Sequence, residues 1–85
     1  MPPRTRRAVG STHSPRYRAF LARLREARVT AGMTQVQAAN ALRRPQSFIA
    51  KAEAGECRVD VVELEQFAKL YGRSLLYFLP KASKR

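Results

Sequence analysis

Histidine, cysteine and tryptophan are nearly missing from the 85 residues, which contain one His, one Cys and no Trp. The lone Cys57 cannot form an internal disulfide, and this fits a reducing cytoplasm. His13 lies in residues 1–14, which hold no cysteine and no second histidine to share a metal ion, so we predict no metal site and no cofactor. A carboxylate pair, a Ser/His/Asp group and a glycine-rich phosphate loop are absent as well. We therefore expect no enzyme.

Long hydrophobic runs are also missing. No stretch reaches the roughly 18 apolar residues that a membrane span requires, and no segment has the form of a secretory signal. We therefore expect a cytoplasmic protein without a membrane partner.

Acidic side chains are few, since six Asp and Glu stand against 17 Lys and Arg, for a formal net charge of +11. The surplus is not confined to the ends of the chain, because residues 15–79 still carry more basic than acidic side chains. Such a charge favours a polyanionic partner, nucleic acid before an anionic membrane surface, although it can also serve solubility alone.

The length allows one domain. Residues 1–14 are rich in Pro, Gly, Ser, Thr and Arg, and we expect them to form a disordered basic arm. Arg4, Arg6 and Arg7 could follow phosphates or enter a minor groove, or could belong to a merely solvated tail. The predicted domain is residues 15–80, near the lower size limit for independent folding, and residues 81–85 form a basic tail.

The central stretch Thr34–Gly55 predicts two short helices joined by a tight turn. Between them lies Arg43-Arg44-Pro45, and proline disfavours helical geometry in the residue before it but suits the first turn of a helix. A link this short makes the two axes cross steeply, as in a helix-turn-helix. The expected inward faces are Val36, Ala38, Ala39 and Leu42 on the first helix and Phe48, Ile49 and Ala52 on the second.

Amphipathic periodicity predicts further helices on both sides. A helix over residues 15–31 turns Tyr17, Phe20, Leu21, Leu24, Ala27 and Ala31 inward, and Arg28 falls on the same stripe. Asp60, with Glu63 three residues later, caps a helix that ends at Gly72. Its expected core face is Val61, Val62, Leu64, Phe67, Ala68 and Leu70, with Tyr71 at the edge. A last apolar turn covers residues 75–79 before Pro80.

These elements resemble the lambda-repressor-like, Cro/XRE-type family of helix-turn-helix proteins. The segments LREARVTAGMTQ (Leu24–Gln35) and GECRVDVVELEQFAKLYG (Gly55–Gly72) are similar to the family's first and fourth helices, and the resemblance extends over residues 17–79. From the end of the first segment onward, four positions match the family's spacing: Gln35, Ala39, Ile49 and Ala52. Two positions depart from the pattern, because Arg43 stands where the family usually has a turn glycine, and Ala52 is smaller than the usual anchor.

The resemblance implies an all-α, five-helix domain and several residue roles. An arginine and a glutamate at positions 28 and 53 of this chain are expected to form a partly buried ion pair, so Arg28 and Glu53 receive a scaffold role. Gln35 is expected to bond a DNA phosphate at the positive end of its helix. Phe78 and Leu79 are expected to be buried.

The outer face of the second motif helix carries the predicted DNA site. If Phe48, Ile49 and Ala52 face inward, short side chains and two long ones face outward. Base readout is assigned to Gln46, Ser47, Ala50 and Lys51, because glutamine suits adenine, lysine suits guanine and a methyl group suits thymine. Further phosphate contacts are assigned to Arg44 and Arg58.

The last apolar turn offers more hydrophobic side chains than its own domain can bury, which suggests a partner surface. We expect a homodimer through Leu75, Leu76 and Tyr77, with the two recognition helices about 34 Å apart. The predicted function is sequence-specific binding of double-stranded DNA by a small dimeric transcriptional regulator or repressor associated with the nucleoid. The alternative is an antitoxin-like module that masks a partner protein through the same turn.

Overall fold

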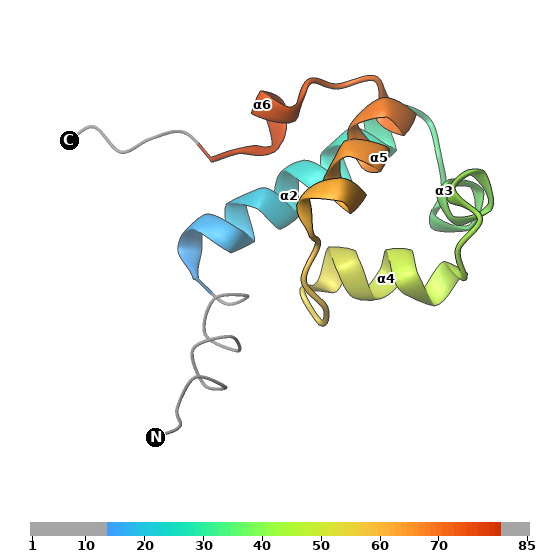
Figure 1. Ribbon diagram of the computed structural model, residues 1–85, viewed down its shortest axis with the longest axis horizontal. Helices are drawn as coiled ribbons and strands as arrows, with labels where there is room; N and C mark the ends of the chain where they lie inside the picture. Colours follow the sequence, from blue (N-terminus) through green and yellow to red (C-terminus); the bar gives the residue numbers. More distant parts are fainter. Residues whose placement is uncertain (1–13, 81–85) are drawn as a thin grey trace.

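The computed structural model describes residues 14–80, and in this range the chain forms five α-helices and no strand. They are α2 (Pro15–Thr30), α3 (Gln35–Leu42), α4 (Gln46–Ala54), α5 (Val61–Tyr71) and α6 (Leu75–Phe78). In Figure 1, α2 runs through the middle of the molecule beside α5, α3 and α4 lie to one side, and α6 lies above α2. The expected all-α class is confirmed.

Local capping fixes where the helices begin. The Ser14 hydroxyl accepts a hydrogen bond from the Tyr17 N–H at 3.0 Å, so Ser14 is the N-cap of α2 and belongs to the domain, one residue outside the predicted boundary. Thr34 and Asp60 each form a capping box with the side chain three residues later. The sequence predicted the Asp60 box correctly.

The core joins all five helices. Leu24, Ile49, Phe67 and Phe78 are the largest side chains with almost no exposure, and each comes from a different helix. Small residues let the motif helices pack closely, since Ala38, Ala39 and Ala52 are at most 1% exposed. The complete set of buried apolar side chains is Phe20, Leu24, Ala27, Ala38, Ala39, Ile49, Ala52, Phe67, Ala68, Tyr71 and Phe78.

Several expected core positions are exposed. Val61 and Val62 are 71% and 59% exposed because α5 packs through its later turns, where Phe67, Ala68 and Tyr71 are buried. Tyr71 is thus a core residue and not an edge residue.

Three more predicted inward positions are wrong for similar reasons. Val36, in the first turn of α3, is 53% exposed. Ala31 is exposed because α2 ends at Thr30. Leu79 is 48% exposed because it leaves α6 in an extended conformation, with ψ at 133°, and does not continue the face that buries Phe78.

The turn between α3 and α4 contains a strained residue. Arg43 has φ 59° and ψ 45°, and it is the one non-glycine residue with a positive φ in residues 14–80. A residue with a side chain pays about 1–2 kcal/mol in this left-handed conformation. Glycine would avoid this strain, but part of the gain would be lost because glycine raises the conformational entropy of the unfolded chain. We therefore expect Arg43→Gly to raise the free energy of unfolding by about 0.5–1 kcal/mol in a urea titration.

Gly32 provides the matched control for this prediction. Its φ is +78°, and no atom lies within 4 Å of the position that a Cβ would occupy, so Gly32→Ala introduces backbone strain without a clash. That variant should lose about as much stability as Arg43→Gly gains. A loss of stability in Arg43→Gly would show that the arginine side chain holds the turn.

The hydroxyl of Tyr71 is buried and has no hydrogen-bond partner in residues 14–80. Burial, followed by the nearby carboxylate of Glu53, raises the pKa of Tyr71 from 10.0 to about 12, and the Arg28 guanidinium opposes this. The folded state holds this proton more tightly than the unfolded state. The protonated Tyr71 therefore contributes fully to the free energy of unfolding below pH 10, and this contribution is lost as the pH rises through about 12.

We therefore expect the free energy of unfolding of Tyr71→Phe at pH 7 to equal that of the wild type or to exceed it by up to about 1 kcal/mol, because the substitution removes an unpaired buried hydroxyl. The difference in stability should widen at pH 11. At that pH Tyr71 of the wild type ionises when the protein unfolds, which favours the unfolded state, and phenylalanine has no such proton to lose. Urea midpoints at the two pH values measure both effects. A clear loss at pH 7 would contradict the assignment of an unpaired hydroxyl.

Candidate nucleic-acid interface

The outer face of α4 presents the four residues assigned to base readout. Gln46, Ser47 and Lys51 are exposed, and Ala50 is half-buried between them. On the opposite face, Ile49 and Ala52 are fully buried. The packing therefore fixes the rotation of α4 about its own axis, and this rotation turns the polar residues to solvent.

The turn before α4 sets its direction. The N–H of Arg43 donates to the Asn40 carbonyl at 3.2 Å, and the N–H of Arg44 donates to the Ala39 carbonyl at 3.0 Å. These bonds close the end of α3, and Pro45 then serves as the N-cap residue of α4 with φ −64°. In Figure 1, α3 is seen nearly end-on while α4 lies in the plane of the view, so the two axes cross steeply. This arrangement is the helix-turn-helix that the sequence predicted.

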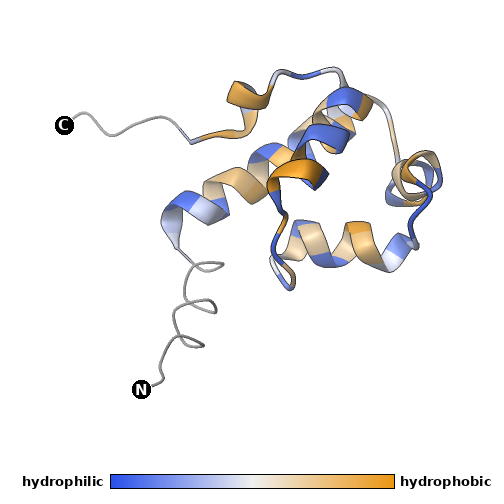
Figure 2. Ribbon diagram, in the orientation of Figure 1, coloured by the Kyte–Doolittle hydropathy of each residue, from blue (hydrophilic) through white to orange (hydrophobic). Residues whose placement is uncertain are grey.

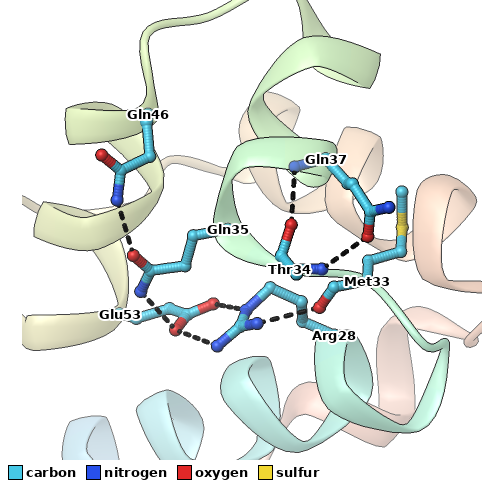
Figure 3. A network of polar contacts seen from close by, with 7 residues as sticks. All are labelled: Arg28, Met33, Thr34, Gln35, Gln37, Gln46 and Glu53. Carbon is cyan, nitrogen blue, oxygen red and sulfur yellow. Dashed lines mark hydrogen bonds and ion pairs between the residues drawn. The ribbon is translucent and has the colours of Figure 1, made fainter.

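An ion pair anchors the other end of α4 to α2. The Arg28 Nε donates to Glu53 Oε2 at 2.6 Å and its Nη2 donates to Glu53 Oε1 at 3.1 Å. Arg28 Nη1 donates to the Met33 carbonyl at 2.9 Å, as Figure 3 shows. The side chains of Arg28 and Glu53 are only 10% and 7% exposed. The hydrogen bond to Glu53 raises the pKa of Arg28 despite its burial, so the guanidinium stays charged.

Two glutamines extend this network to the surface. Gln35 Nε2 donates to Glu53 Oε1 at 3.2 Å, and Gln46 Nε2 donates to Gln35 Oε1 at 2.9 Å (Figure 3). A chain of polar contacts thus runs from the buried Arg28 to the exposed Gln46. Sequence reasoning assigned both glutamines to DNA but missed the bond between them. Gln46 keeps its amide oxygen and second N–H for another partner, and these are the two groups that pair with an adenine edge.

The predicted phosphate contacts occupy different environments. Gln35 lies in the first turn of α3, and Arg58 is exposed in the segment between α4 and α5. The Arg44 guanidinium instead lies over the Phe48 ring, 3.7 Å from its centre, with Nη2 3.7 Å from Glu63 Oε2. Arg4, Arg6 and Arg7 of the predicted arm, His13 and the tail 81–85 lie outside the described residues.

The three residues predicted to form a dimer interface do not share one environment. Arg23 and Arg73 lie over the Tyr77 ring, at 5.5 and 4.5 Å, and Arg23 Nη1 also donates to the Tyr77 carbonyl at 2.6 Å. Tyr77 therefore holds α6 on its own domain. Leu75 and Leu76 are 43% and 76% exposed, and Figure 2 shows α6 in the orange of hydrophobic residues.

Other kinds of site are not found in the described part of the chain. Residues 14–80 contain no group of three His, Cys, Asp or Glu side chains that could hold a metal ion. None of the helices in the same range is long and apolar enough to cross a membrane.

Comparisons with known proteins agree with this geometry. The family described as a helix-turn-helix domain matches residues 18–75. No curated protein matches the chain. Among solved structures, the chain is similar to an XRE-family like protein from Pseudomonas syringae pv. tomato str. DC3000, with 42% sequence identity and a TM-score of 0.71. That match covers 81% of this chain and 86% of the other. The protein therefore belongs to the XRE family of helix-turn-helix proteins, a family of DNA-binding regulators.

Proposed function

We propose that this protein binds double-stranded DNA at a specific sequence and regulates transcription from nearby promoters. The observation that carries the proposal is the outer face of α4, where Gln46, Ser47 and Lys51 are exposed while Ile49 and Ala52 anchor the helix from behind. A helix with this relief can approach base edges in a major groove, because its short side chains let the backbone come close. The net charge of +11 supplies long-range attraction to DNA.

Each residue on this face has a suitable partner in the groove. Gln46 can pair with adenine through its amide oxygen and the N–H that Gln35 does not use. Lys51 can donate to guanine O6 and N7, Ser47 can bond a base or a phosphate, and the Ala50 methyl can contact thymine. The mechanism is binding alone and needs no chemical step.

Phosphate contacts would set the register of the complex. Gln35 lies in the first turn of α3, where backbone N–H groups and the helix dipole favour an anion. Arg58 is exposed in the segment that follows α4, and it would supply a positive charge for a second phosphate contact. Such contacts add affinity for any duplex, and the bases then select among duplexes.

A homodimer through α6 would complete the regulator. Leu75 and Leu76 give α6 an exposed apolar surface, and a two-fold axis there would place two α4 helices about 34 Å apart, one turn of DNA. The bound dimer would act by blocking or recruiting polymerase.

The same surface also supports a second candidate, an antitoxin-like module that masks a partner protein. Sedimentation of the isolated protein separates them, because a stable homodimer favours the regulator and a monomer favours a missing partner.

Selection of bound duplexes from a random DNA pool tests the proposed function. We expect an enriched consensus made of two inverted half-sites, with adenine and guanine positions that depend on Gln46 and Lys51. Recovery of unrelated sequences, each bound equally well, would contradict sequence-specific binding. A single enriched half-site would support specific binding by a monomer.

A further inference from the structure

Arg44 is the outermost member of a stack that runs from the surface into the core. Its guanidinium carbon lies 3.7 Å from the centre of the Phe48 ring. Phe48 is parallel to Phe67, with the ring centres 5.9 Å apart and an angle of 2° between the planes. Phe67 in turn stacks on Tyr71 at 5.8 Å. Because Phe67 and Tyr71 are 1% and 6% exposed, the inner end of the stack cannot easily move.

A second contact holds the same guanidinium. Arg44 Nη2 lies 3.7 Å from Glu63 Oε2, and the side chains of the two residues are 38% and 22% exposed. Glu63 is itself fixed, because its Oε1 accepts the N–H of Asp60 at 3.1 Å in the capping box of α5. Arg44 is thus attached at once to the first turn of α4 and to the first turn of α5.

We propose that Arg44 is a positioning residue for DNA readout and not a phosphate contact. This inference rests on the proposed function. Gln46 and Ser47 follow Arg44 by two and three residues, in the same first turn of α4 as Phe48. By pressing the Phe48 ring onto Phe67, Arg44 fixes the distance of this turn from α5 and therefore the place of Gln46 in the groove. Readout groups need positions fixed to within about 0.5 Å, which makes such a support valuable.

The remaining contacts of α4 explain why this end needs support of its own. The Arg28–Glu53 pair holds the last turns of α4, and Ile49 and Ala52 hold its middle. The first turn has no side-chain cap, because its N-cap residue is Pro45, and its other polar contact is the solvent-exposed hydrogen bond from Gln46 to Gln35. A guanidinium that turned toward DNA would have to leave both Phe48 and Glu63, and it would release this uncapped turn.

The test compares Arg44→Ala with Arg58→Ala on two duplexes, the one selected from the random pool and a scrambled duplex of equal length. Affinities are measured over a series of salt concentrations. We expect Arg44→Ala to bind the selected duplex about fivefold more weakly, the size of one cation–π contact, and the scrambled duplex equally well. The salt slope, which is the slope of the logarithm of affinity against the logarithm of salt concentration, should not change for Arg44→Ala. Arg58→Ala should weaken both duplexes and flatten the slope by about 0.9, as loss of a phosphate contact requires.

Two further variants separate positioning from simple stability. Phe48→Leu should also lose preference for the selected duplex, and adding Arg44→Ala to it should cost little more, because both act through one contact. Arg44→Lys keeps the charge but loses the planar face, so it should resemble Arg44→Ala. Thermal unfolding, measured in parallel, shows that every variant is folded at the binding temperature.

The outcomes are distinguishable. A salt slope reduced by about 0.9 in Arg44→Ala, or full recovery in Arg44→Lys, would overturn the inference and return Arg44 to the phosphate contacts. Equal losses on both duplexes would overturn it as well. If the wild type itself does not prefer the selected duplex over the scrambled one, the proposed function fails, and the inference fails with it.

Discussion

Glu53→Ala should lower the free energy of unfolding by about 3–5 kcal/mol, because it leaves the Arg28 guanidinium buried without its counter-charge. Arg28 is 8% exposed, and Glu53 accepts two of its three side-chain hydrogen bonds. Small domains have total stabilities of this order, so a large part of the protein should be unfolded at 37 °C. Thermal unfolding followed by circular dichroism should show a Tm lowered by more than about 15 °C.

Glu56→Ala is the matched control, since it removes the same charge from an exposed residue three positions away. It should change stability by less than about 0.5 kcal/mol. Replacing both members of the pair, as in Arg28→Met with Glu53→Leu, should recover much of the loss, because hydrophobic pairs of similar volume often replace a buried ion pair without cost. A Glu53→Ala variant as stable as Glu56→Ala would mean that Arg28 finds solvent or another partner.

The same substitution should also disturb DNA binding in any protein that stays folded. Glu53 Oε1 accepts from Gln35, and Gln35 accepts from Gln46. Removing the carboxylate therefore frees a residue proposed for phosphate contact and a residue proposed for base readout. The scaffold and the candidate DNA site share one polar network, so stability and binding cannot be changed independently at this position.

Features that depend on neighbouring residues in the sequence could be predicted from it. Both capping boxes, the turn at Arg43-Arg44-Pro45 and the inward face of α4 follow from local rules of helix termini and periodicity. The family resemblance added the pairing of Arg28 with Glu53, which periodicity alone could not supply, because it shows only that Arg28 faces inward.

Features that depend on which turns meet another element could not be predicted. Periodicity placed Val61 on the core face of α5, yet the first turn of α5 is uncovered and Val61 is 71% exposed. The bond between Gln35 and Gln46 joins residues eleven positions apart, and the crossing of α3 and α4 brings them together. The same limit applies to Arg44. Its position just before α4 suggested a phosphate contact, and the sequence could not show that its side chain lies over Phe48 and beside Glu63.

Lys51→Ala should weaken binding to the selected duplex by about 1–3 kcal/mol, the cost of losing one specific base contact. Lys51 is exposed on the outer face of α4, one turn beyond Ser47, and the neighbouring Ala50 is too short to replace it. The scrambled duplex should lose much less, because there the lysine contributes only charge. Lys69→Ala is the control, since it removes the same charge from an exposed position on α5 and should affect both duplexes little.

The guanine that Lys51 contacts can be found by changing the DNA instead of the protein. Each guanine of the consensus is replaced in turn, and one replacement should weaken the wild type by about the same 1–3 kcal/mol while costing Lys51→Ala nothing further. This coupling identifies a direct contact, because a lysine that acted only through its charge would respond to every replacement alike. Equal losses on the selected and scrambled duplexes would instead assign Lys51 to the phosphate backbone, and base selection would then have to come from Gln46 and Ser47 alone.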